Sequence, residues 1–183
     1  LDGLLVGVVG FGTIGVAVAR AFHAAGCRIC FHDPAPRDAA AAQALGAVAM
    51  SLDELLAAAD VITLHVPLLP ATQGLIGARE LGRMKAGAIL VQAARGGIVD
   101  EAALAASLAS GRLGGAAVDV YATEPPTADN PLLKVTGEAA ARLLLTPHIA
   151  GVTRQASALL FRSAWENVER VLVRGEAPVN RAY

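Results

Sequence analysis

Short apolar runs alternate with helical patterns along most of this 183-residue chain. Strands buried on both faces produce such continuous runs, and helices between consecutive strands return the chain so that the strands lie parallel. The alternation therefore predicts an α/β fold, a doubly wound parallel sheet covered by helices on both faces. The apolar runs are Leu4–Val9, Arg28–His32, Val61–Val66, Ala88–Val91, Ala116–Val120 and Leu143–Thr146.

Three helices are indicated between these runs by their boundary residues. A stripe of apolar residues at three- and four-residue spacing runs from Ile14 to Ala25, and Gly26 is suited to end that helix. The sequence Ser51-Leu52-Asp53-Glu54 reads as a capping box, and Asp100 can cap a further helix that stops at Gly111. No internal repeat or low-complexity linker interrupts this series.

The loop after the first apolar run has the form G-x-G-x-x-G, in Gly10-Phe11-Gly12-Thr13-Ile14-Gly15. The pattern alone is weak, since an ordinary strand–turn–helix can contain it, but here it follows a strand directly and opens an amphipathic helix. Gly10 permits a tight turn, Gly12 a close approach of backbone N–H groups to a pyrophosphate, and Gly15 close packing of helix on strand. We therefore predict a Rossmann-type dinucleotide-binding loop, with the phosphates at the helix N-terminus.

An acidic residue ends the second predicted strand, where such a site needs a partner for the adenosine ribose. Asp33 lies 18 residues beyond Gly15. Its carboxylate can accept hydrogen bonds from the ribose hydroxyls and repels a 2′-phosphate, so NAD is favoured over NADP. Arg37 lies close enough in sequence to soften that preference.

Three functional side chains, Arg95, Glu124 and His148, each follow a later apolar run. Taken singly, they can be a surface ion pair, a solvated loop acid and a packed loop histidine. The carboxyl ends of parallel strands meet at one edge, however, so the fold brings all three to the side of the nucleotide loop. Together they suit reversible hydride transfer to a 2-oxo acid, with His148 moving the proton, Glu124 orienting it and Arg95 holding the substrate carboxylate.

Composition excludes several other classes of function. The formal net charge of −1 and the charged fraction of 17% give no basic field for nucleic acid. The uncharged stretch from Gly3 to Ala19 is rich in glycine, which argues against a membrane span, and no basic segment precedes it, so we expect a cytoplasmic protein. Cys27 and Cys30 lie in a strand pattern, and we expect buried inert thiols instead of a redox pair or half of a metal site. We predict no bound metal.

Five ordered motifs cover nearly the whole chain and together resemble the D-isomer-specific 2-hydroxy-acid dehydrogenases. They are Gly10-Phe11-Gly12-Thr13-Ile14-Gly15, His65-Val66-Pro67, Ala94-Arg95-Gly96-Gly97-Ile98-Val99-Asp100, Ala117-Val118-Asp119-Val120-Tyr121 with Glu124-Pro125, and Thr146-Pro147-His148-Ile149-Ala150-Gly151. The resemblance is strongest to the phosphoglycerate, glycerate and hydroxypyruvate dehydrogenases.

This resemblance implies a set of site residues. Arg95, Glu124 and His148 match the family's catalytic trio, Asp119 matches its nicotinamide-contacting acid, and the His65-Val66-Pro67 loop is expected against the adenosine half. Gln92 stands where the family often has asparagine, in the loop that presents Arg95. The candidate cofactor-binding residues are Gly10, Gly12, Thr13, Ile14, Gly15, Asp33, His65, Val66, Pro67, Thr72, Ala93, Ala94, Arg95, Asp119, His148, Ala150 and Gly151.

The resemblance also bears on domain organisation. We expect a dinucleotide-binding domain at 1–152, and a helix and tail at 153–183 that in the family return toward a substrate domain, which we expect to be absent from this chain. The segment Thr153–Arg174 has a broad apolar helical face that needs a partner surface, so we expect a homodimer.

Two functions remain open at this point. The first is an NAD-dependent oxidoreductase of small 2-hydroxy or 2-oxo acids, of which this chain is the nucleotide-binding part and is expected to turn substrate over poorly by itself. The alternative is an NAD(H)-sensing binding module of the corepressor type, without significant turnover. Formate dehydrogenases share the fold, but their reaction needs no proton transfer and they resemble this chain less at Glu124.

Overall fold

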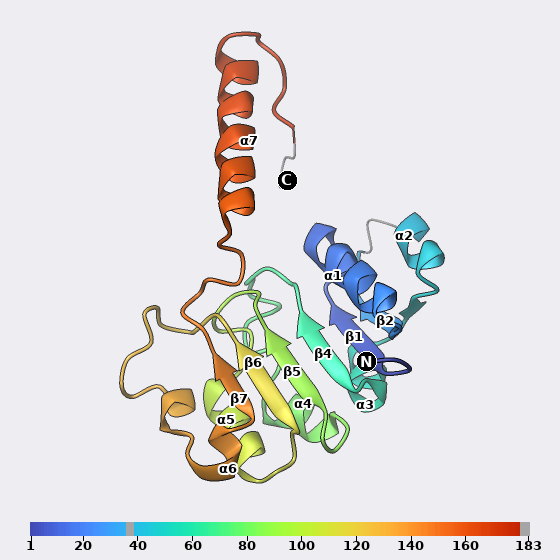
Figure 1. Ribbon diagram of the computed structural model, residues 1–183, viewed down its shortest axis with the longest axis vertical. Helices are drawn as coiled ribbons and strands as arrows, with labels where there is room; N and C mark the ends of the chain where they lie inside the picture. The colour runs from blue at the N-terminus through green and yellow to red at the C-terminus, as the bar shows by residue number, and fades with distance from the viewer. Residues whose placement is uncertain (36–38, 180–183) are drawn as a thin grey trace. The chain divides into compact units, whose positions relative to one another are not determined.

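The structure is a computed structural model that describes residues 1–35 and 39–179. Within these residues the strands form one parallel sheet of seven, in the order β3-β2-β1-β4-β5-β6-β7 (Figure 1). The predicted doubly wound α/β fold is confirmed. The strands are β1 (Leu5–Val9), β2 (Arg28–His32), β3 (Val48–Ala49), β4 (Val61–Leu64), β5 (Ile89–Gln92), β6 (Gly115–Val118) and β7 (Leu143–Leu145).

Helices cover both faces of the sheet, as its apolar strands require (Figure 1). Alternate residues of β1 face opposite ways: Val6 and Val8 join the core cluster beneath α1 and α2, whereas Val9 joins the cluster beneath α3, α4 and α5. The helices are α1 (Thr13–Ala24), α2 (Ala39–Ala44), α3 (Leu52–Ala58), α4 (Ala78–Arg83), α5 (Glu101–Ala109), the 3₁₀ turn η1 (Pro131–Lys134), α6 (Gly137–Ala140) and α7 (Arg154–Leu172).

The predicted helix boundaries at Gly26, Ser51 and Asp100 are confirmed. Gly26 follows the end of α1 with φ +86°, in the left-handed region that glycine adopts at little cost. The Ser51 hydroxyl accepts from the Glu54 N–H while the Glu54 carboxylate accepts from the Ser51 N–H, which completes the capping box of α3. The Asp100 side chain accepts from the N–H groups of Ala102 and Ala103 at the start of α5.

Several short elements were not predicted, because they lack a readable period. Strand β3 has two exposed residues and pairs with the edge of β2, and helices α2 and α4 have six residues each. Four strands are also shorter than predicted, β4 by two residues and β1, β6 and β7 by one each. Strand β4 ends at Leu64, since the chain must leave the sheet before Pro67, which has no N–H to donate, and β6 ends at Val118, ahead of Asp119.

The chain divides into two compact units, Leu1–His148 and Ile149–Tyr183. The first contains the whole sheet. In the second, α7 begins at the N-cap Thr153, whose hydroxyl accepts from the Ala156 N–H, and contains no buried residue. Among the residues described, no helix is long and apolar enough to cross a membrane.

Both cysteines lie buried in the first unit with free thiols, as predicted. Cys27 donates to the carbonyl of Leu1, and burial raises the pKa of the Cys30 thiol to about 11. A thiol with so high a pKa is not ionised near neutrality and is a poor nucleophile.

Candidate active site

The sheet reverses its winding between β1 and β4, and two cavities open at the carboxyl ends of these strands. Such a switch point is where open α/β sheets bind ligands. One cavity, of about 440 Å³, extends from Asp33 across Gly10 and Gly12 to Thr72. The other, of about 420 Å³, extends from Ile14 to Ala94 and Arg95. Both are lined by His65, Val66 and Pro67, so this loop forms a wall between two halves of one site.

The glycines of the first loop serve different physical purposes. Gly10 has φ +94°, and a Cβ there would lie 2.7 Å from the His65 carbonyl, so the turn also needs a residue without a side chain. A Cβ at Gly15 would lie 2.0 Å from the Gly10 oxygen, where α1 crosses its own loop. A Cβ at Gly12 would meet nothing within 4 Å. The fold therefore does not require glycine at position 12, and the open space there fits a phosphate approaching the backbone at the N-terminus of α1.

The carboxylate of Asp33 is held at the edge of this loop. One oxygen accepts from the Phe11 N–H at 2.7 Å and the other from the Ala35 N–H at 2.8 Å. Each oxygen can accept a further hydrogen bond, and Asp33 lines the cavity, where ribose hydroxyls can donate. Arg37, which the sequence suggested as a modifier of this preference, lies outside the described residues.

The loop that carries Arg95 is folded around the buried side chain of Gln92. The Gln92 amide nitrogen donates to the Arg95 carbonyl at 2.8 Å, and its oxygen accepts from the Ala94 N–H at 3.2 Å. The exposed Arg95 guanidinium donates to the Ala94 carbonyl at 2.6 Å and lines the second cavity. The longer glutamine thus closes a compact turn where the family often has asparagine, and it orients Arg95 toward the cleft.

Glu124 and His148 form a hydrogen-bonded pair, with His148 Nδ1 2.7 Å from Glu124 Oε2. The other Glu124 oxygen accepts from the Tyr121 N–H at 3.0 Å. The bond from His148, and then that from Tyr121, hold the pKa of the Glu124 carboxyl below its usual range. An ionised Glu124 leaves His148 Nε2 free to face a substrate oxygen, which is the arrangement a general acid–base histidine needs.

A third hydrogen-bond set joins the ends of β6 and β7. The Thr146 hydroxyl donates to the buried carboxylate of Asp119, and the Tyr121 hydroxyl donates to the Thr146 carbonyl at 2.9 Å. Burial, followed by the charges of Asp119, Glu101 and Glu124, raises the pKa of the Tyr121 phenol. These bonds fix the loops that present Glu124 and His148 against each other.

The loop of Arg95 packs against the loop of Glu124 at Gly96. A Cβ at Gly96 would lie 1.7 Å from the Tyr121 carbonyl oxygen, so only glycine permits this approach. The structure therefore places the three candidate catalytic residues on the loops after β5, β6 and β7, with the first two loops in direct contact. His148 has φ +55°, a conformation that non-glycine residues adopt rarely and that is concentrated at functional sites.

Other candidate cofactor residues have different surroundings. The Thr72 hydroxyl is bonded within its own loop, to the Pro67 carbonyl and the Leu69 N–H, so it shapes the cavity wall. Thr13 begins α1, and Ala93 is exposed beside the buried Ala94. Ala150 and Gly151 belong to the second unit, and their role stays a prediction.

Sequence reasoning missed several residues that line the two cavities. They are Pro34, Ala35, Leu68, Leu69 and Ala71. Leu68 and Leu69 are 47% and 49% exposed beside the cavities that they line. Adjacent leucines between two prolines were the available signal, because a solvated loop has little use for them.

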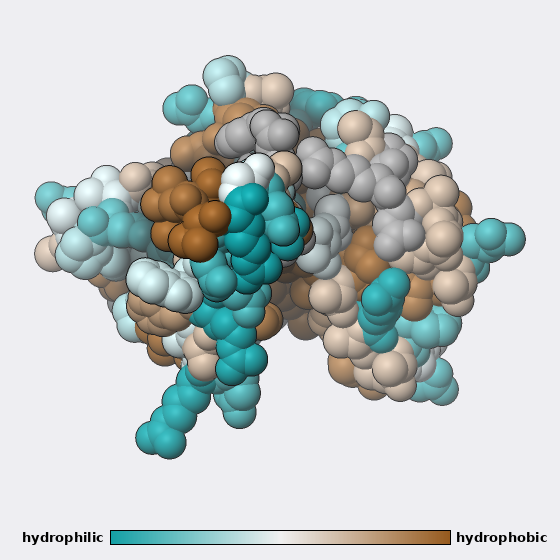
Figure 2. Space-filling model, turned by 90° about the horizontal axis from the view of Figure 1, so that it is seen from above, coloured by the Kyte–Doolittle hydropathy of each residue, from teal (hydrophilic) through white to brown (hydrophobic). Residues whose placement is uncertain are grey.

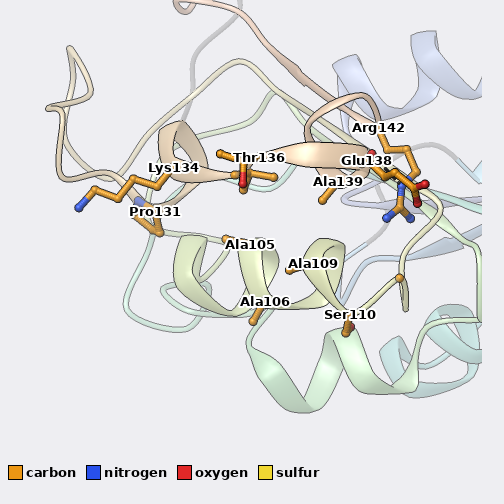
Figure 3. Close-up of a pocket in the computed structure, with 12 residues that line it drawn as sticks. Ala105, Ala106, Ala109, Ser110, Pro131, Lys134, Thr136, Glu138, Ala139 and Arg142 are labelled. Carbon is orange, nitrogen blue, oxygen red and sulfur yellow. Dashed lines mark hydrogen bonds between the residues drawn. The ribbon is translucent and has the colours of Figure 1, made fainter.

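A further cavity, of about 600 Å³, lies away from this edge, between α5, η1 and α6 (Figure 3). Its floor is made of Ala105, Ala106 and Ala109. The Arg142 guanidinium beside it donates hydrogen bonds to the backbone carbonyls of Leu108 and Leu113. Lys134 and Glu138 also line this cavity, but it has neither the glycine loop nor the histidine–carboxylate pair of the sheet edge.

Comparison with known proteins agrees with this geometry. Residues 1–150 match the family model of the D-isomer specific 2-hydroxyacid dehydrogenase, NAD binding domain. The chain belongs to this family. Its fold is the family's NAD-binding domain, and NAD is the cofactor that this domain binds.

Relatives and a solved structure extend the likeness. The chain is 46% identical over 156 residues to a D-3-phosphoglycerate dehydrogenase of Archaeoglobus fulgidus, covering 85% of this chain and 28% of the relative. It is 46% identical over 172 residues to an (S)-sulfolactate dehydrogenase of Chromohalobacter salexigens, covering 93% of this chain and 54% of the relative. The holo D-mandelate dehydrogenase of Rhodotorula graminis superposes with a TM-score of 0.87 at 33% identity, covering all of this chain and 52% of that one. The chain thus spans about half, or less, of the length of these proteins.

Proposed function

We propose that this chain is the cofactor-binding part of an NAD-dependent dehydrogenase that interconverts a small 2-hydroxy acid and its 2-oxo acid. The observation that carries the proposal is the 2.7 Å pair of His148 and Glu124, at the same sheet edge as Arg95 and the cavities beside the glycine loop. Binding of a cofactor alone does not require a histidine that is hydrogen-bonded to a carboxylate. The name of the Archaeoglobus fulgidus relative supports a substrate of the phosphoglycerate kind.

The residues present suit each part of the reaction. Bound NAD supplies the hydride acceptor for oxidation and, when reduced, the hydride donor for reduction. Arg95 binds the substrate carboxylate through its planar guanidinium and polarises the adjacent carbonyl. His148 gives a proton to the carbonyl oxygen during reduction and takes it from the hydroxyl during oxidation, while Glu124 holds the imidazole in place.

The test is the loss of turnover on replacing His148 in an enzyme that contains this chain together with a substrate-binding domain. His148→Ala should remove most oxidation of 2-hydroxy acids and leave NADH affinity nearly unchanged, because the imidazole acts on the proton. His23→Ala, at an exposed histidine of α1, is the matched control and should retain full turnover. Turnover in His148→Ala equal to that of the control would end the proposed role.

Cofactor choice is tested on the chain itself by calorimetry with NADH and NADPH. Asp33→Ala should weaken NADH binding by about tenfold, roughly 1.4 kcal/mol, and narrow the difference between the two cofactors. Unchanged discrimination would show that Asp33 does not read the ribose.

The NAD(H)-sensing alternative has no support from these relatives, which are named as dehydrogenases. Oxidation or reduction of any acid in a panel of 2-hydroxy and 2-oxo acids would separate the two functions. An enzyme turns substrate over, whereas a sensor only binds the cofactor.

The proposal also covers the compartment, the partners and the oligomeric state of the protein. The two free buried thiols support a reducing compartment such as the cytoplasm. The net charge of −1, with polar and apolar residues mixed over the face shown in Figure 2, supports a small-molecule substrate and no nucleic-acid partner. The apolar face of α7 supports a homodimer, with a second copy covering the exposed Leu160, Phe161 and Trp165.

A further inference from the structure

One carboxylate outside the proposed catalytic trio holds both ends of the loop that carries Glu124. Glu101 is the first residue of α5, directly after the N-cap Asp100. One of its oxygens accepts from the Ala122 N–H at 2.8 Å, and the other accepts from the Asn130 amide at 2.9 Å. Ala122 and Asn130 bracket Glu124 in sequence, so a single side chain closes the loop at both sides.

We call the Glu101 side chain with its bonds to Ala122 and Asn130 the Glu101 clamp. The Asn130 end of this clamp is anchored in the core. Asn130 is 8% exposed, and its amide oxygen accepts from the Leu132 N–H at 2.9 Å, which caps η1. Because that oxygen is occupied, the Asn130 amide cannot turn over without losing the cap. Its NH₂ group therefore needs the Glu101 acceptor, since a buried donor without a partner is unfavourable.

The Ala122 end of the clamp is linked by the backbone to the residues that hold the proposed acid–base pair. Ala122 follows Tyr121, whose N–H donates to Glu124 Oε1, and the opposite oxygen of Glu124 holds His148. Gly96, from the Arg95 loop, packs on the Tyr121 carbonyl at this point. A shift of Ala122 would therefore move the donor that orients Glu124 and the surface on which the Arg95 loop rests.

We propose that Glu101 is a positioning residue, which holds the Tyr121–Asn130 loop so that Glu124 faces His148. The inference rests on the proposed function, because the pair it positions is the proposed acid–base pair. Glu101 acts on Glu124 only through its bonds to Ala122 and Asn130. Its position is set by the N-terminus of α5, a rigid element whose Leu104 and Leu108 are buried in the core.

The test is the titration of the Glu124 side-chain carboxyl, followed by carbon NMR in this chain. Two effects of Glu101→Ala have opposite signs. Removing a negative charge favours ionisation of Glu124 and lowers its midpoint, whereas loss of the bonds from His148 and Tyr121 raises it. The groups that face Glu124 are His148, Tyr121 and Asp119, and none of them is altered in this variant.

If Glu101 positions the loop, Glu101→Ala raises the Glu124 midpoint by roughly half or more of the rise measured in His148→Ala. Hydrogen exchange at the Ala122 amide also accelerates. Glu138→Ala removes another first-turn glutamate, that of α6, and should change neither quantity. A Glu124 midpoint that is unchanged or lowered in Glu101→Ala overturns the inference.

A second variant decides the matter if the alanine variant does not fold. Glu101→Asp keeps the charge at the helix N-terminus and shortens the reach, so the clamp opens without a change of net charge. The Glu124 midpoint should rise here as well, and a wild-type midpoint overturns the inference. NADH affinity should stay within about twofold of wild type in Glu101→Ala, Glu101→Asp and Glu138→Ala. Failure of this test leaves the turnover of His148→Ala unaffected as a test of the proposed function.

Discussion

Gly12 and Gly15 stand three residues apart in the cofactor loop, and the structure requires glycine at only one of them. A Cβ at Gly15 would collide with the Gly10 oxygen at 2.0 Å, while a Cβ at Gly12 would meet open space. We predict that Gly15→Ala lowers the free energy of unfolding by about 1–3 kcal/mol. Gly12→Ala should change it by less than about 0.5 kcal/mol.

Gly12→Ala should nevertheless weaken NADH binding by about tenfold or more, because the added methyl stands where the pyrophosphate approaches. Urea unfolding and NADH fluorescence on both variants measure the two quantities. Equal stability of the two variants would contradict the assignment of Gly15 to packing, and unchanged NADH affinity in Gly12→Ala would contradict the assignment of Gly12 to the phosphate.

A pH dependence of stability follows from the lowered pKa of Glu124. The folded-state pKa lies below the unfolded one, chiefly through the bond from His148, so this stabilisation is complete above the ordinary glutamate pKa. It is lost as the pH falls through the folded-state value. The loss of unfolding free energy in that acid range should be smaller in His148→Ala than in wild type, as measured by urea unfolding at several pH values. Parallel profiles would show that the pair does not form in solution.

Residue identities allowed much of the site to be predicted from the sequence. Gly10, Asp33, His65 and Arg95 line the cavities at the switch point because a parallel sheet collects its strand ends. The Glu101 clamp could not be predicted, since its partners lie 21 and 29 residues away. Only the folded backbone brings a helix N-terminus against that loop.

At the scale of elements, helix caps illustrate which boundaries a sequence can specify. The Ser51 side chain accepts from the Glu54 N–H, whereas the N-cap Thr136 of α6 makes no side-chain bond. We predict that Ser51→Ala lowers the free energy of unfolding by about 1 kcal/mol, and that Thr136→Ala has a clearly smaller effect. Urea unfolding measures the two losses. Equal losses in the two variants would show that the hydrogen bonds of the capping box do not stabilise the protein.

The elements that the sequence did not reveal are those stabilised by their neighbours. Strand β3 is two residues long and is stabilised by pairing with β2. Helix α6 has four residues, too few for a helical period to be recognised in the sequence. By contrast, α1 combines an apolar stripe with Gly26 just past its end, and α5 combines buried leucines with the N-cap Asp100. Local pattern and tertiary packing agree there, so their positions were predictable.

At the scale of the whole molecule, the two units differ in what they bury. Every helix of the first unit contributes a buried residue to the cores, whereas α7 contributes none. A chain that ends at residue 152 should therefore unfold cooperatively, with a midpoint in urea close to that of the full chain. Loss of cooperative unfolding on this truncation would show that residues 153–183 belong to the same folding unit.

The proposed dimer can be tested with the single tryptophan of the chain. Trp165 is 72% exposed on α7, so its emission should shift to shorter wavelength as concentration rises and a second copy covers it. Phe161→Glu should abolish both this shift and the dimer seen by sedimentation, because burial of the new charge is costly. Gln155→Glu, which adds the same charge about a third of a turn round the helix from Phe161, is the control. Monomer at all concentrations in the wild type would refute the dimer.

The order of the strands separates two tasks along one edge of the sheet. Loops after β1, β2 and β4 line the cavity that ends at Asp33, while those after β5, β6 and β7 present Arg95, Glu124 and His148. In the proposed dehydrogenase, changes in the preferred nucleotide and changes in the acid that is oxidised can therefore accumulate on separate peptide segments. A scaffold of this kind can acquire a new substrate while its coenzyme stays the same. It can equally exchange its coenzyme without a change in the residues proposed to transfer the proton.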